Sequence, residues 1–300
     1  MKVLLYDFRW NDPETCQFEG AGVTDNFANK FGVKPIQIGN PLSLEICSEV
    51  RCAGSREHGR WKPCPKQATG KPKCDYCRAI EGNFVYTAFD GFDQSQLQPG
   101  DLEKIAGKHL VYLALFEKDL IKVGVCKSER KELRQLEQGS HATLFVAEAP
   151  DGIAARQIES LLRKTGLGDK IKSSEKKDLL LPSVSCSEAE KILRTLLAEK
   201  KELISTEEHL KSFWKSEPEF CCWEPLYQTG KLPTSPLMIQ LEKGDWLSGT
   251  LVAKKGPFLV LEAASDLVAL DTKYLRGREV DFTPRPAGLQ TSRVLQNALF

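Results

Sequence analysis

The chain has 300 residues, with 42 Lys and Arg against 41 Asp and Glu, and its formal net charge is +1. This length allows two or three domains, and the near-neutral balance means that any attraction to nucleic acid must come from local basic patches. No stretch of the sequence approaches the roughly 20 apolar residues that span a bilayer, so we expect no membrane partner.

The cellular compartment is predicted from the N-terminus and the cysteines. The first residues become acidic at Asp7, too early for a signal peptide. The ten cysteines include a Cys-x-x-Cys pair, which is more typical of metal binding than of a secreted disulfide framework. We therefore expect a cytoplasmic protein.

Residues 1–49 form a β-rich N-terminal segment in this interpretation, with Lys2 to Trp10 and Ile36 to Ile46 as the better strand candidates. We assign no chemistry to it.

Residues 50–80 form a four-cysteine segment. Cys52, Cys64, Cys74 and Cys77 follow the spacing C-x11-C-x9-C-x2-C among glycines and prolines, with few apolar residues to bury. Four thiolates around one zinc ion would hold such a segment, because metal-binding free energy becomes folding free energy. The alternatives are unligated or partly buried cysteines, and His58 is either a substitute ligand or a surface residue.

The same segment is basic. Between Val50 and Ala79 there are eight Lys and Arg residues against two acidic ones, a local net charge of +6. Basic residues interleaved with Trp61 and Tyr76 suit phosphate contact and base stacking. The other interpretation is that a metal-held loop simply needs a polar surface.

After a connector at residues 81–108, residues 109–182 predict a core with the order β-β-α-β-α. Two runs of β-forming residues joined by Lys118-Asp119 predict a hairpin. Ser128 is the expected N-cap of a helix that ends at Gly139. A strand from Ala142 to Ala149 and a helix from Asp151 to Arg163 follow.

This order and its residues resemble the GIY-YIG nuclease fold, in the subgroup whose second motif is Lys-aliphatic-Gly. Leu110-Val-Tyr112 stands where the family has GIY, and Lys122-Val-Gly124 stands where it has YIG. Arg134 matches the family's arginine, and Glu159 matches its metal-binding glutamate.

The resemblance implies an endonuclease that hydrolyses nucleic-acid phosphodiesters. Glu159 would hold Mg²⁺ or Mn²⁺, and Arg134 would stabilise negative charge in the transition state. Tyr112 would orient or deprotonate the attacking water, which for a base requires a lowered pKa. A zinc ion with four cysteine ligands would be structural, because catalytic zinc keeps an open coordination position.

Three departures from the family pattern keep a second class open. Lys122 replaces the second tyrosine, Gln138 stands where a histidine is frequent, and the asparagine expected after the second helix has no clear counterpart. The alternative is a non-catalytic, zinc-containing nucleic-acid-binding protein with a degenerate core, in which Glu159 merely pairs with Arg163. A scaffold that does not bind nucleic acid is a third possibility. The choice of DNA or RNA and the oligomeric state stay open.

Residues 183–242 predict a helical segment and a linker. Two capping boxes, Ser187-x-x-Glu190 and Ser205-x-x-Glu208, predict helices over Glu188–Glu202 and Thr206–Lys215. The vicinal pair Cys221-Cys222 lacks metal-ligand spacing, and we assign it no role.

Residues 243–285 predict a small SH3- or OB-like β-barrel, followed by a tail at 286–300. The barrel either binds nucleic acid through its basic residues or completes a core with residues 1–49; these basic residues are Lys254, Lys255, Arg276 and Arg278. The whole arrangement is similar to an uncharacterised bacterial family with such a core between a four-cysteine, zinc-ribbon-like segment and a small β domain. We expect an α+β protein.

Overall fold

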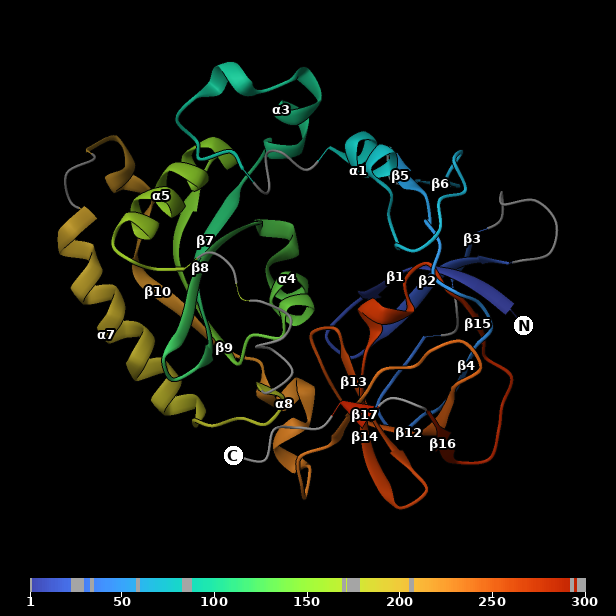
Figure 1. Cartoon of the computed structure of the whole chain (residues 1–300). Coiled ribbons are helices and arrows are strands. Elements are labelled where there is room, and N and C mark those ends of the chain that lie inside the picture. The colour runs from blue at the N-terminus through green and yellow to red at the C-terminus, as the bar shows by residue number, and fades with distance from the viewer. Residues whose placement is uncertain are drawn as a thin grey trace. The chain divides into compact units, whose positions relative to one another are not determined.

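The computed structural model describes residues 2–22, 30–32, 35–57, 60–82, 88–168, 171, 179–204, 208–291 and 294–295. The chain forms two compact units: a terminal unit, Met1–Gly82 with Lys231–Phe300, and a central unit, Asn83–Gly230. Both contain strands and helices, so the predicted α+β class is confirmed (Figure 1).

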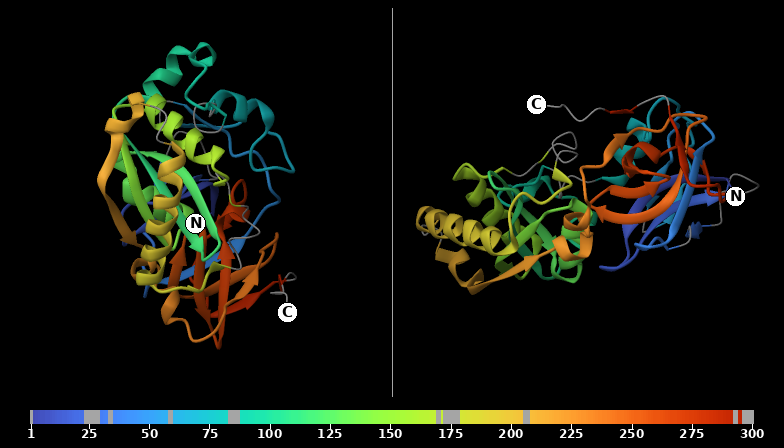
Figure 2. Two further views of the ribbon diagram at one scale, coloured as in Figure 1. Left: turned by 90° about the vertical axis from the view of Figure 1, so that its left-hand side faces the viewer. Right: turned by 90° about the horizontal axis from the view of Figure 1, so that it is seen from below.

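The terminal unit is built on one large sheet to which both ends of the chain contribute. Figure 2 shows the blue N-terminal strands beside the orange and red C-terminal strands. The sheet has the order β17-β11-β14-β13-β12-β4-β15-β1-β2-β3, with β16 pairing with β12. Its strands are β1 (Lys2–Trp10), β2 (Cys16–Gly22), β3 (Lys30–Gly32), β4 (Pro41–Ile46), β11 (Leu237–Ile239), β12 (Trp246–Lys255), β13 (Phe258–Ala263), β14 (Asp266–Asp271), β15 (Glu279–Asp281), β16 (Gly288–Gln290) and β17 (Val294–Leu295).

The two ends meet at β4. Its residues alternate between buried and less buried positions, with Leu42, Leu44 and Ile46 facing the core, as expected for a strand with one buried face. β4 pairs antiparallel with both β12 and β15. The C-terminal strands therefore complete a core with residues of the N-terminal segment, which was one of the two possibilities left open by the sequence.

A hairpin and a short helix extend from this sheet. Strands β5 (Ser55–Glu57) and β6 (Arg60–Lys62) pair antiparallel, and helix α1 (Asp75–Glu81) follows. The cysteines of the candidate metal centre lie around these three elements. A 3₁₀ helix, η6 (Thr272–Leu275), precedes β15.

The central unit has a four-stranded sheet with the order β10-β9-β7-β8. The predicted order β-β-α-β-α is present as β7 (His109–Glu117), β8 (Leu120–Lys127), α4 (Lys131–Gln138), β9 (Ala142–Ala149) and α5 (Gly152–Lys164). Further elements are η1 (Gln94–Gln96), α3 (Pro99–Ile105), η2 (Ser128–Arg130), α7 (Cys186–Ile204), η4 (Glu208–Phe213), β10 (Trp214–Cys222), α8 (Glu224–Tyr227) and η5 (Thr229–Lys231).

The two faces of the central sheet are covered differently. Val111, Leu113 and Val123 pack in one hydrophobic cluster with the apolar residues of α5 and α7. Successive side chains of a strand point to opposite faces, so Tyr112 and Gly124 lie on the other face. Helix α4 covers that face in Figure 1.

Helix starts differ from the predictions in two places. Ser128 does not cap α4: it lies in η2, and Arg130 is the N-cap residue of α4. The first predicted capping box is displaced by two residues, because the side chains of Ser185 and Glu188 bond each other and each other's backbone amides. Gly139 ends α4 as predicted, with φ of 74°.

The second predicted helix of the 183–242 segment is wrong where it is described. Only Glu208–Phe213 is helical, as the 3₁₀ helix η4, and Trp214 already begins strand β10. β10 is an edge strand, which tolerates Pro218, and it is held by pairing with β9 and by Trp214 and Phe220 packing against the core. These are tertiary contacts that a local pattern does not reveal.

A disulfide joins Cys186, at the start of α7, to Cys222, at the end of β10. No local pattern links these two residues, which are 36 positions apart. In the chain-entropy model, a loop of this length contributes roughly 3–4 kcal/mol to the free energy of unfolding.

Candidate functional site

The four cysteines predicted to bind metal form one buried cluster in the terminal unit. Their Sγ atoms all lie within 4.8 Å of one another. The hairpin β5–β6 separates Cys52 from Cys64, while Cys74 is the N-cap residue of α1 and Cys77 lies in its first turn. This arrangement brings together ligands that are far apart in sequence.

Backbone amides donate hydrogen bonds to the sulfur atoms of Cys52 and Cys64, although burial raises the pKa of Cys52 and of Cys77. The amides of Gly54 and Cys74 donate hydrogen bonds to Sγ of Cys52, at 3.4 Å and 3.2 Å. Burial raises the pKa of Cys64, but hydrogen bonds from the amides of Ala68 and Lys66 and from neighbouring thiols lower it to about 6. Because the thiolate is the metal-binding form, this donor set fits a tetrahedral ion such as zinc.

Few apolar side chains support this segment. In the described part of the chain, the local cluster consists of the four cysteines themselves, with Ala68 packed against it. His58, the alternative ligand, lies outside the described residues. The stability of the cluster therefore depends on the ion that its sulfur atoms bind.

In the central unit, Tyr112 and Gly124 form a complementary pair. They are directly opposite each other on β7 and β8, and Tyr112 is 1% exposed. A Cβ atom at position 124 would lie 2.5 Å from the Tyr112 hydroxyl oxygen. The glycine of the Lys-Val-Gly motif is thus needed to make room for the tyrosine of the Leu-Val-Tyr motif.

Gly124→Ala should therefore lower the free energy of unfolding by about 1–3 kcal/mol, because the buried phenol ring must shift to admit the methyl group. Urea unfolding measures this change. Gly168→Ala is the matched control, because a Cβ there meets nothing within 4 Å. Equal stability of the two variants would contradict the steric interpretation.

Tyr112 positions the side chains of α4. Its hydroxyl accepts a hydrogen bond of 2.8 Å from Nε2 of Gln138, and it also interacts with the guanidinium of Arg134. Burial raises the pKa of Tyr112, and the positive charge of Arg134 offsets this only in part. This direction is opposite to the one that a tyrosine base requires, so Tyr112 is a neutral phenol that orients Arg134 at neutral pH.

Lys122 shares the face of Tyr112 and Gly124. It lies opposite Ala114 in the β7–β8 ladder, two residues from Gly124, and its Nζ is 6.0 Å from the centroid of the Phe116 ring. Tyr112 and Lys122 therefore lie on the same face of the sheet, and Arg134 lies on α4, the helix that covers this face.

Glu159 comes from the other side. It lies on α5, is 6% exposed, and forms an ion pair with Arg156 rather than the exposed pair with Arg163 considered from the sequence. Its charge still acts on Tyr112, but as a minor influence on the pKa. Among the described residues, the groupings with metal-ligand proximity do not include Glu159.

A buried polar network next to α4 was not predicted. Gln138 occupies the position one turn after Arg134 and also bonds the Arg134 carbonyl oxygen. Tyr227 donates to the carbonyl oxygen of Ser140 at 3.0 Å, and Trp223 Nε1 donates to Oγ1 of Thr143 at 2.9 Å. The only signal in the sequence was the four-residue spacing of Arg134 and Gln138.

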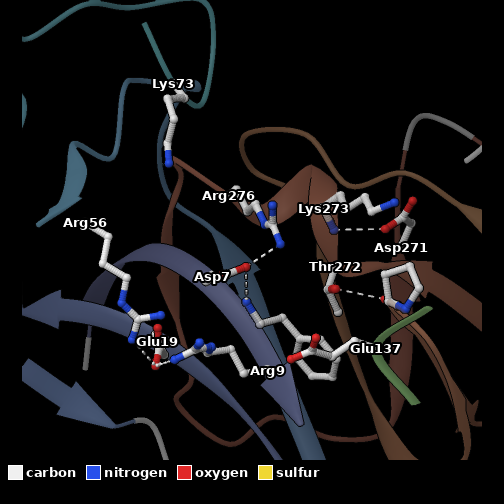
Figure 3. A network of polar contacts seen from close by, with 12 residues as sticks. Asp7, Arg9, Glu19, Arg56, Lys73, Glu137, Asp271, Thr272, Lys273 and Arg276 are labelled. Atoms are coloured by element: carbon white, nitrogen blue, oxygen red, sulfur yellow. Dashed lines mark hydrogen bonds and ion pairs between the residues drawn. The ribbon is translucent and has the colours of Figure 1, made fainter. Parts of the chain in front are cut away.

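Ion pairs neutralise much of the basic four-cysteine segment. Arg56 and Arg9 converge on Glu19, at 3.5 Å and 3.1 Å (Figure 3). Further pairs join Lys62 to Glu57, Lys73 to Glu81, Arg51 to Glu279, and both Lys71 and Arg78 to Asp75. Three of these acidic partners, Glu19, Glu81 and Glu279, lie outside the segment, so about half of its excess charge of +6 is balanced by residues that the fold brings in.

The two aromatic residues of the segment differ in availability. Trp61 is partly buried and packs on Tyr6, with ring centroids 4.8 Å apart, against the core of the N-terminal strands. Tyr76 is 43% exposed, and Nζ of Lys66 lies 4.9 Å from its ring centroid. Lys66 and Tyr76 are thus the pair that keeps an exposed aromatic surface beside a positive charge.

The basic residues of the C-terminal strands serve the fold. Lys254 and Lys255 are buried, and Nζ of Lys254 lies 4.2 Å from the Trp10 ring centroid and donates to the carbonyl oxygen of Glu14. Arg276 forms an ion pair with Asp7 (Figure 3). Nucleic-acid contact through the two lysines, considered from the sequence, is excluded by their burial.

Fold and site together define an α+β protein with a buried four-cysteine cluster suited to a metal ion. The chain belongs to the family described as "Protein of unknown function (DUF2797)", whose model matches residues 39–280. That range includes all four cysteines and the whole central unit.

Comparisons with curated proteins and with solved structures give no match. No helix in the described ranges is long and apolar enough to cross a membrane.

Proposed function

We propose that this protein binds nucleic-acid phosphates on the face of the central sheet that carries Arg134, and that a structural zinc ion holds its four-cysteine segment. The proposal keeps the likeness of the central unit to the GIY-YIG fold. It does not require hydrolysis, and it leaves DNA and RNA both as ligands.

One observation carries the proposal: an exposed arginine is held by a buried tyrosine. Arg134 is exposed, while Tyr112 and Gln138, which it contacts, are buried. A guanidinium that is already oriented loses little side-chain entropy when it binds, and its planar donors match a phosphate. This is the chemistry of an anion-binding group.

The zinc ion has a structural role in this proposal. Its four cysteine ligands leave no open coordination position for substrate. The exposed pair of Lys66 and Tyr76 beside the cluster supports a second contact, in which the ring stacks on a base and the lysine meets a phosphate. Reduced zinc thiolates fit a cytoplasmic protein, which is part of the same proposal.

Endonuclease activity is the second candidate. It is favoured by the order of the motifs on the strands and helices, and by the electrostatic influence of Glu159 on Tyr112. Glu159 would hold Mg²⁺ or Mn²⁺, which would polarise the scissile phosphate while Arg134 stabilises the developing charge. The ion pair of Glu159 with Arg156 competes with metal binding, so binding without cleavage is the function that the geometry supports better.

Replacement of Arg134 tests the binding site. Hydrogen bonds to a charged group contribute about 1.5–3 kcal/mol, so Arg134→Ala should weaken binding roughly ten- to a hundredfold. Fluorescence anisotropy with labelled single-stranded and branched DNA and RNA at low salt measures this change.

Arg194→Ala is the matched control for Arg134→Ala. Arg194 is also exposed and helical, but it lies on α7 and pairs with Glu190 at 2.7 Å. If both variants bind as tightly as the wild type, Arg134 is not the phosphate-binding residue.

A further inference from the structure

A second cluster of metal-binding residue types lies in the central unit, outside the site described above. His141, Cys186 and Cys222 place one ligand atom each within 4.8 Å of one another. His141 directly precedes β9, Cys186 begins α7 and Cys222 ends β10, so three separate elements meet there. His141 is buried, and both cysteines are partly exposed.

The fold fixes this meeting point from several sides. The amide of His141 donates to the carbonyl oxygen of Leu115, at 2.8 Å, and its own carbonyl oxygen accepts from the amide of Trp223, at 3.0 Å. Cys222 is paired with Ala142 in the β9–β10 ladder. The backbones of His141 and Cys222 are therefore held by the sheet, and these contacts do not involve the sulfur atoms.

We propose that His141, Cys186 and Cys222 form a second metal site when the two cysteines are reduced, and that the disulfide is the metal-free state of the same site. Two thiolates and one imidazole are a donor set for zinc, which binds such ligands at about 2.0–2.3 Å. Three protein ligands leave the fourth tetrahedral position to water or another small ligand.

Metal binding and disulfide formation exclude each other, because both use the same sulfur electron pairs. With a peroxide as oxidant, the two thiolates lose two electrons and form the S–S bond. The O–O bond of hydrogen peroxide breaks, two protons are taken up, two water molecules form, and the zinc ion is released. A dithiol reductant reverses the exchange by becoming a disulfide itself and returning the two cysteines as thiols.

Either state ties the start of α7 to the end of β10, covalently or through the metal. Oxidation removes the metal ion, and with it the open coordination position that the reduced site offers to water or another small ligand. The inference does not depend on nucleic-acid binding or on the four-cysteine cluster, because its ligands all lie in the central unit.

The test compares the zinc content of four proteins, measured by elemental analysis after reduction, incubation with zinc and removal of unbound metal. The reduced wild type should hold one zinc ion per chain more than Cys222→Ser and more than His141→Gln. Oxidised wild type, with the Cys186–Cys222 link verified by peptide mapping, is incubated with zinc without a reductant and should hold as much zinc as the two variants.

Cys221→Ser is the control, because it removes the neighbouring thiol without touching the cluster. It should keep the full zinc content. Any loss of fold in His141→Gln is detected by circular dichroism, and Cys222→Ser provides the independent comparison. If reduced wild type and Cys222→Ser hold the same amount of zinc, the second site does not exist.

Discussion

Cys74→Ser should remove one zinc ion per chain and unfold the four-cysteine segment while the central unit stays folded. Ala53 and Trp61 pack with the N-terminal strands, but Ala68 is the described apolar side chain that packs against the cysteines, so the metal supplies most of the stability around them. In zinc-finger peptides the apparent binding free energy of structural zinc is about 10–16 kcal/mol, far more than the remaining contacts of such a segment provide. Elemental analysis gives the zinc content, and hydrogen exchange gives the local stability of residues 52–81.

This measurement is made on non-reduced protein, in which the disulfide keeps Cys186 and Cys222 from binding metal. Cys47→Ser is the matched control, since Cys47 is a partly buried thiol of the terminal unit that lies outside the cluster. It should leave zinc and exchange rates unchanged. Wild-type zinc content in Cys74→Ser would show that the four cysteines are not the ligands.

Hydrolysis should depend completely on Glu159 if the central unit is an endonuclease. Glu159→Gln removes the charged metal ligand at nearly constant size, so magnesium- or manganese-supported cleavage should disappear while binding persists. Loss of a preorganised charge-stabilising group lowers turnover by about 10²–10³-fold, so Arg134→Ala should also be strongly impaired. Gel assays of labelled DNA and RNA measure both effects.

The burial of Glu159 adds a consequence for stability. Its replacement leaves Arg156 partly uncompensated in a buried pair, which costs on the order of 3 kcal/mol. A thermal melt must therefore accompany the assay, with Glu190→Gln on α7 as the control. If folded Glu159→Gln still cleaves, Glu159 is not the metal ligand. If the wild type does not cleave, the endonuclease candidate fails and the binding function stands without it.

Local patterns in the sequence predicted much of the core. The β7–β8 hairpin was predicted from two β-forming runs around Lys118-Asp119. The end of α4 was predicted from Gly139, because glycine adopts the left-handed backbone conformation at a helix end without steric cost. The four cysteines were found from their spacing. Each of these features depends on interactions between near neighbours in the chain.

Features that depend on distant contacts could not be predicted. The charge of Arg56 is compensated by Glu19, 37 residues away, and Lys254 is buried against Trp10 from the opposite end of the chain. Strand β10 and the Cys186–Cys222 disulfide likewise require the finished sheet. A count of charges or a helical pattern contains no information about such partners.

The salt dependence of binding tests most directly whether the protein binds nucleic-acid phosphates. Anisotropy titrations of the wild type with single-stranded and branched DNA and RNA are repeated over a series of salt concentrations. We expect micromolar or tighter binding at low salt, with log K falling by about 0.7–0.9 per phosphate contact for each unit of log salt, and a shallower slope for Arg134→Ala. No saturable binding to any of these ligands at low salt, or an affinity that does not change with salt, would contradict the claim.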